Sequence, residues 1–180
     1  MTDERYHRRS IRLHGYDYTL PGAYFVTICT AGRACLFGEV VNGEMILNEY
    51  GRIMEEEWAR SGNIRREMTL DAFVVMPNHL HGVVILNSDP LGTATVGAHG
   101  RAPLRLERAP RSLGAFVAGF KSAATKGINA LRGSPGATVW QRNYYEHIIR
   151  DDADLEATQW YILDNPARWG EDPDNPAVNP

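Results

Sequence analysis

The sequence predicts an α+β protein in which helices pack on one face of an antiparallel sheet, and a ferredoxin-like arrangement is the simplest candidate. Residues 73–85 form an apolar run rich in valine that Pro77 interrupts, which predicts two buried strands that meet at the proline. Residues 23–30 form an aromatic and β-branched strand. Apolar residues recur at helical spacing in two further stretches, 48–60 and 112–133. Strands and helices therefore alternate unevenly, which favours an α+β sandwich.

A hairpin and a capped helix follow the first strand. The dipeptide Asn42-Gly43 lies between two short strand-like runs, and it is a strong signal for a two-residue hairpin turn. Asn48 can cap the helix that extends to about residue 60, because its side-chain oxygen can accept hydrogen bonds from the backbone of the first turn.

The second half of the chain holds two more helices. Ser112 can cap the first of them, and Gly133 closes its apolar face. Asp151 or Asp152 can cap the last helix. That helix ends before Pro166, because a proline disfavours helical geometry in the residue that precedes it.

The chain divides into one domain with two charged ends. Its length of 180 residues, with 43% hydrophobic and 23% charged residues, is typical of one soluble globular domain. We expect a basic arm over residues 1–15, the domain over residues 16–170 and an acidic tail over residues 171–180. Within the domain, residues of about 88–110 are rich in glycine, proline, alanine and arginine without a period, which predicts a mobile loop.

The sequence favours a cytoplasmic protein without a membrane partner. Its start lacks the apolar stretch of a signal peptide, and no apolar run is long enough to cross a bilayer. Cys29 and Cys35 have no CxxC spacing, which fits a reduced compartment.

Two histidines and a tyrosine are the candidate site residues. His79 and His81 point to the same face, roughly 7 Å apart along the chain, because side chains alternate across a strand. Two such imidazoles can share a divalent metal ion, or both could be core residues with satisfied hydrogen bonds. Tyr161 and Asn165 lie about one turn apart on the last helix. Tyr161 could attack a phosphodiester beside a metal to which Asn165 supplies an oxygen, or it could be a packing aromatic.

Four sequence blocks, in this order and spacing, resemble those of the single-tyrosine HUH transposases. They are residues 24–30, residues 76–81 with the His-hydrophobic-His motif, residues 139–150 and residues 161–166. With these blocks the chain looks like a REP-associated tyrosine transposase, a branch related to the insertion-sequence transposases.

The resemblance implies a ferredoxin-like fold, a divalent metal (Mg or Mn) and a covalent 5′-phosphotyrosine intermediate on single-stranded DNA. By position, His79 and His81 are implied metal ligands and Tyr161 is the implied nucleophile. Asn165 stands where the family has its third ligand, which is glutamine in the insertion-sequence branch. His147 lies in a family block and could bind DNA or support the metal site.

The implied partner is single-stranded DNA that carries hairpins of repetitive extragenic palindromes. A net charge of −3 gives no global argument for nucleic acid, so local cations must contact the phosphates. The predicted DNA-binding residues are Arg8, Arg9, Arg12, Lys121, Arg142 and His147. Tyr144 and Tyr145 are candidates for base stacking or for the core.

The predicted function is a metal-dependent single-stranded DNA endonuclease and strand-transferase that cleaves next to hairpins, acting as a monomer or homodimer. The chain could alternatively be a domesticated, hairpin-specific single-stranded DNA-binding protein without mobility. It could also be a metal-dependent hydrolase of another substrate in which Tyr161 is structural. A covalent DNA adduct separates the first function from both others.

Overall fold

The computed structural model describes residues 16–88 and 111–178, which form an α+β unit. Four antiparallel strands make the main sheet, in the order β4-β5-β1-β6. Its elements are β1 (Gly22–Cys29), α1 (Glu49–Ile64), β4 (Met68–Val75), β5 (His79–Leu86), α2 (Leu113–Leu131) and β6 (Tyr145–Ile149). This chain order and this strand order together are the ferredoxin-like arrangement. The predicted fold class is therefore confirmed.

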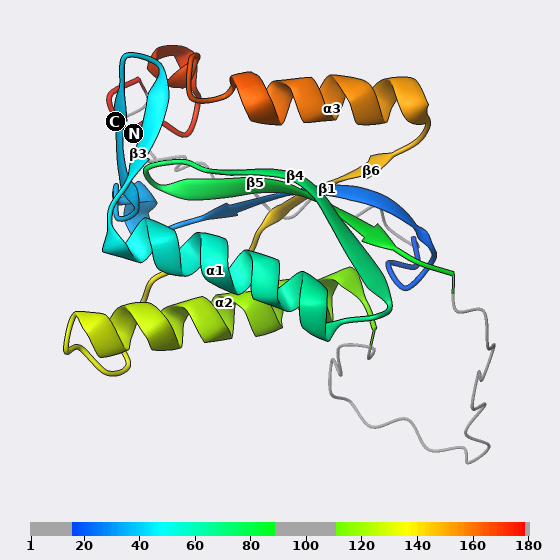
Figure 1. Ribbon diagram of the computed structural model, residues 1–180, viewed down its shortest axis with the longest axis horizontal. Coiled ribbons are helices and arrows are strands. Elements are labelled where there is room, and N and C mark those ends of the chain that lie inside the picture. The colour runs from blue at the N-terminus through cyan, green and yellow to red at the C-terminus, as the bar shows by residue number, and fades with distance from the viewer. Residues whose placement is uncertain (1–15, 89–110, 179–180) are drawn as a thin grey trace, which may run out of the picture.

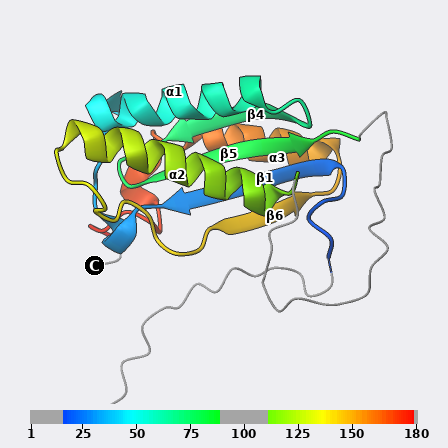
Figure 2. The ribbon, with the colours of Figure 1, turned by 90° about the horizontal axis from the view of Figure 1, so that it is seen from below.

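The helices lie on both faces of the sheet. Helices α1 and α2 cover one face, whereas α3 (Asp152–Asp164) lies on the other (Figure 1; Figure 2). The expectation that all helices pack on one face is therefore wrong for α3. The reason is that β1 and β5 are apolar on both faces, so Phe25 and Val83 form a second, smaller core with Ile162 of α3. Such a surface is buried only when another element covers it.

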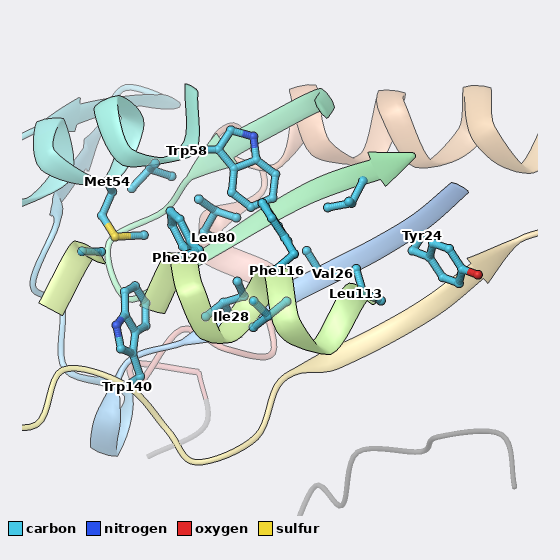
Figure 3. Close-up of a cluster of buried hydrophobic side chains, with 14 of the residues drawn as sticks. Tyr24, Val26, Ile28, Met54, Trp58, Leu80, Leu113, Phe116, Phe120 and Trp140 are labelled. Carbon is cyan, nitrogen blue, oxygen red and sulfur yellow. The ribbon is translucent and has the colours of Figure 1, made fainter. Parts of the chain in front are cut away.

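The larger core lies between the sheet and helices α1 and α2. Figure 3 shows Trp58 of α1 and Phe116 and Phe120 of α2 gathered with Leu80 and Val26 of the central strands. All five side chains are fully buried. Burial of apolar surface contributes roughly 25 cal/mol per Å², so this cluster is the main contact that holds the two helices to the sheet.

The helices begin at the predicted capping residues. The side chains of Asn48, Ser112 and Asp151 each accept a hydrogen bond from a backbone N–H in the first turn of α1, α2 and α3, respectively. These bonds satisfy donors that have no partner within the helix. The three predicted caps are confirmed.

A β-hairpin and two short 3-10 helices are the remaining regular elements of the described residues. They are β2 (Gly38–Val41), β3 (Glu44–Leu47), η1 (Ala31–Arg33) and η2 (Trp169–Glu171). Asn42 and Gly43 have φ angles of 53° and 82°, as the predicted hairpin turn requires. The tip of the hairpin approaches Ala167, and Figure 1 shows it beside the turns that follow α3.

Some predictions lie outside the described residues. One is the basic arm over residues 1–15, which contains Arg8, Arg9 and Arg12. The other is the loop expected over residues of about 88–110, of which residues 89–110 are not described. Within residues 16–88 and 111–178, no helix has both the length and the hydropathy needed to cross a bilayer.

Candidate metal and nucleophile site

A buried pair of histidines marks the face of the sheet that α3 covers. The turn at residues 76–78 starts β5 at His79, whose carbonyl accepts the Met76 N–H over 2.8 Å. Alternation along β5 then puts His79 and His81 on one face. Their Nε2 atoms lie 3.0 Å apart, and the two residues are 0% and 3% exposed. The structure therefore brings the predicted pair together.

The Nδ1 atoms of both imidazoles have hydrogen-bond partners. His79 Nδ1 lies 2.8 Å from Asn78 Oδ1, an acceptor, so this nitrogen carries the hydrogen. His81 Nδ1 lies 2.9 Å from Oγ1 of Thr27, the residue opposite it in the register of β1 and β5. A hydroxyl can accept as well as donate. When Thr27 accepts, the Nε2 lone pairs of both rings are available to one metal ion.

A carboxylate from the far end of the chain joins the pair. Asp172 follows η2, and its Oδ2 lies 3.8 Å from His79 Nε2. One ligand atom from each of His79, His81 and Asp172 lies within 4.8 Å of the other two. Asp172 is 5% exposed, and its Oδ2 has no hydrogen-bond partner among the described residues. Imidazole and carboxylate ligands suit a divalent metal, so this cluster could bind one. Sequence analysis placed Asp172 in an acidic tail and gave it no role.

Tyr161 reaches the same cluster from α3. Its hydroxyl lies 3.4 Å from His81 Nε2. The ring of Phe25 stacks on His81 and contacts Tyr161 edge-on, at centroid distances of 5.2 and 5.9 Å. Tyr161 is 42% exposed, in contrast to the buried histidines. Tyr161 therefore lies between the buried candidate ligand cluster and solvent.

Asn165, the predicted third ligand, ends the helix that carries Tyr161. It is the C-cap of α3 and is 3% exposed. Its Oδ1 has no hydrogen-bond partner among the described residues. A buried acceptor without a partner costs about 1–3 kcal/mol, and coordination of a cation would offset this cost.

An open groove of about 330 Å³ runs from Tyr161 along α3. It is lined by Phe25, Tyr145, His147, Asp154, Ala157, Thr158 and Tyr161. His147 Nε2 lies 3.2 and 3.1 Å from the two carboxylate oxygens of Asp154. The Arg150 backbone N–H, and after it the His147 side chain, hold the pKa of Asp154 below its ordinary value. The groove therefore has aromatic walls and a charged end.

Two further predicted DNA-binding residues, Lys121 and Arg142, lie near the start of β6. Lys121 Nζ donates to the carbonyls of Gln141 and Asn143 over 2.8 and 2.9 Å, so it holds the main chain on both sides of Arg142. Arg142 itself is exposed. Tyr144 packs against the larger core, whereas Tyr145 lines the groove and is 40% exposed. The two tyrosines thus have different surroundings, which sequence analysis left open.

Comparison with known proteins places the chain in a family. No protein-family model matches it. An uncharacterized protein from Haemophilus influenzae is 39% identical over 168 residues, which span 93% of this chain and 92% of that protein. The chain belongs to the same family as this Haemophilus protein.

Solved structures that match this one include two described as transposases. A REP-associated tyrosine transposase bound to a REP hairpin matches with a TM-score of 0.51 and 18% identity, over 86% of this chain and 73% of that chain. A candidate transposase from Deinococcus radiodurans R1 matches with a TM-score of 0.41 and 16% identity, over 83% of this chain and 94% of that chain. The first match shows that the chain has the fold of a REP-associated tyrosine transposase, as its sequence blocks predict.

Proposed function

We propose that this family member is a metal-dependent single-stranded DNA endonuclease and strand-transferase of the transposase type, which cleaves next to hairpins of repetitive palindromic DNA. Tyr161 carries the proposal, because this residue is 42% exposed and its hydroxyl lies 3.4 Å from Nε2 of His81 in the buried histidine pair. The shared fold supports the proposal, since the matching transposase is bound to a REP hairpin.

His79, His81 and Asn165 hold Mg²⁺ or Mn²⁺ in this proposal. Two observations fit such an ion: both imidazoles can present Nε2 to one point, and Asn165 Oδ1 is buried without a hydrogen-bond partner among the described residues. When bound, the metal withdraws charge from the non-bridging oxygens of the scissile phosphate, which makes phosphorus more open to attack.

Tyr161 performs the covalent step. Its phenolic oxygen forms a bond to phosphorus while the bond from phosphorus to the 3′-oxygen of the DNA breaks. The phenol loses one proton and the departing 3′-hydroxyl gains one, so the step is balanced. The product is a 5′-phosphotyrosine ester. Because the ester bond is kept, a DNA 3′-hydroxyl can later reverse the reaction without ATP.

The groove beside Tyr161 receives the nucleotide next to the scissile phosphate. Bases stack on exposed aromatic rings with about 1–3 kcal/mol each, and Tyr145 offers such a ring. His147 and Arg142 provide phosphate contacts, and Lys121 contributes by holding the main chain around Arg142.

A covalent adduct tests this function. Single-stranded oligonucleotides, each with a palindromic hairpin flanked by randomised stretches, carry a 3′-fluorophore, because a 5′-phosphotyrosine retains the 3′ part of the DNA. After incubation with MnCl₂, wild-type protein is expected to give a fluorescent band on a denaturing protein gel. Tyr161→Phe is expected to lose the band. Tyr145→Phe is the matched control, since this tyrosine lines the same groove at 40% exposure, and it should keep the band.

Two other outcomes would reject the proposal. Tight hairpin binding without an adduct in Mn²⁺ or Mg²⁺ would identify the chain as a single-stranded DNA-binding protein. An adduct that persists in Tyr161→Phe would assign the nucleophile to another residue.

A further inference from the structure

We infer that Asp172 is an additional ligand of the metal, and that residues 172–175 are held against β5 in order to deliver it. The inference rests on the proposed metal site of His79 and His81. It adds an anionic ligand from a segment that lies beyond the nucleophile helix.

The polar side chains of residues 172–175 are buried, although the sequence of this segment is typical of a solvated acidic tail. Asp172, Asp174 and Asn175 are 5%, 4% and 7% exposed. Burying a carboxylate is costly unless it is paired or coordinates a metal. The position of each carboxylate therefore has to be explained by a partner.

Asp174 has such a partner. The Arg33 guanidinium lies 3.5 Å from Asp174 Oδ1 and also donates to the carbonyl of Pro173 over 3.2 Å. Arg33 belongs to η1, which directly follows the strand of Thr27. These contacts fasten the segment to the end of the sheet where the histidines lie.

Asn78 ties the segment to the histidine pair. Its Nδ2 donates to the Asp174 carbonyl over 2.7 Å, and its Oδ1 accepts from His79 Nδ1 over 2.8 Å. Asn78 is 1% exposed. One buried side chain therefore fixes both the ring of a proposed ligand and the main chain two residues after Asp172, which makes Asn78 a positioning residue.

The carboxylate of Asp172 has one satisfied oxygen and one without a hydrogen bond. Oδ1 accepts the Asp174 N–H, whereas Oδ2 has no hydrogen-bond partner among the described residues and lies 3.8 Å from His79 Nε2. Two ligand atoms on one Mg²⁺ are about 3–4 Å apart at metal–oxygen distances near 2.1 Å. The spacing of Oδ2 from the imidazole thus suits two ligands of one ion.

The charge of the proposed ligands gives a second reason to include Asp172 among them. His79, His81 and Asn165 are neutral ligands, whereas Mg²⁺ and Mn²⁺ are hard cations that favour carboxylate oxygen. Asp172 supplies the negative charge that this set lacks.

Titration of the full-length protein with MnCl₂ tests the inference, with the EPR signal of free Mn²⁺ as the readout. Asp172→Asn keeps an oxygen that can accept the Asp174 N–H but removes the charge. We expect it to weaken Mn²⁺ binding at least tenfold, since even partners that only support a ligand cost about 10–100-fold. Glu171→Gln is the matched control, because it removes one negative charge beside Asp172 from an exposed side chain that is no proposed ligand and does not fasten the segment. It should bind Mn²⁺ within about threefold of wild type. His79→Ala reports on the metal site as a whole.

Each result separates the inference from the proposed function. If His79→Ala loses binding while Asp172→Asn keeps wild-type affinity, the metal site stands and the inference fails. If Glu171→Gln weakens binding as much as Asp172→Asn, negative charge near the site acts at a distance and Asp172 is not a ligand. If wild type and His79→Ala bind Mn²⁺ equally, the proposed metal site itself fails.

A measurement on wild type alone avoids the question of whether a variant folds. Fe²⁺ loaded in place of Mn²⁺, with ascorbate and peroxide, cleaves and oxidises the chain close to the bound ion. Peptide mapping should then find damage at residues 172–174 as well as at residues 79–81. Damage restricted to residues 79–81 would overturn the inference.

Discussion

Replacing Gly82 by alanine tests how tightly β5 packs against α1 next to the histidine pair. A Cβ at this position would lie 2.4 Å from Cζ2 and 2.7 Å from Cη2 of the Trp58 indole. The indole cannot easily move away, because it is 1% exposed and Phe73, Phe116 and Phe120 contact it at centroid distances of 5.8, 5.3 and 5.3 Å. Overpacking of this kind costs about 1–3 kcal/mol. For a domain of this size, the unfolding temperature should fall by about 2–12 °C.

Thermal unfolding followed by circular dichroism, without added metal, measures this change. Gly170→Ala is the control, because a Cβ there meets nothing within 4 Å and its φ is not in the left-handed region. A second test places Gly82→Ala in a Trp58→Phe background, where the smaller ring should reduce the penalty by about 0.5–3 kcal/mol. If Gly82→Ala destabilises no more than Gly170→Ala, the close approach of α1 to β5 is not as described and the reasoning fails.

Three further predictions concern the site and the helix ends. Thr27→Val removes the partner of His81 Nδ1, so Mn²⁺ affinity in the EPR titration should fall about 10–100-fold. Asn48→Ala removes the cap of α1, and denaturant unfolding should show a loss of about 0.5–2 kcal/mol. The pKa of Asp154 is lowered in the folded protein, first of all by the hydrogen bond from the Arg150 backbone N–H. The ionised Asp154 carboxylate therefore stabilises the folded protein above the unfolded pKa of about 3.9, and this contribution is lost as the pH falls through the lower folded pKa. Wild type and Asp154→Asn should therefore differ in unfolding temperature near neutral pH and converge below about pH 4.

The elements of the fold could be predicted because their signals are local. Asn42-Gly43 sets a turn through its own backbone angles, and Asn48 and Ser112 cap helices within their own first turns. The face on which α3 packs could not be predicted in this way. That choice depends on apolar side chains such as Phe25, which point away from the larger core and require a cover of their own.

The site was predictable only in part, for the same physical reason. His79 and His81 share a face because strands have a period of two, and this period is visible in the sequence. Asp172 looks like part of a solvated charge run, because its burial depends on contacts made through residues about one hundred positions earlier in the chain, such as Asn78. Lys121 looks like a free cation in the sequence, yet it donates to two main-chain carbonyls.

Alternation along the central strands links the stability of the fold to the geometry of the site. Val26 and Leu80 point into the core under α1 and α2, while the next residues along, Thr27 and His81, face α3 and hydrogen-bond to each other. A register slip of one residue would exchange the two faces of a strand completely. The large core penalises such a slip heavily, because it would place polar side chains among buried aromatic rings. The packing on one face of the sheet therefore fixes the register that aligns the proposed ligands on the other face.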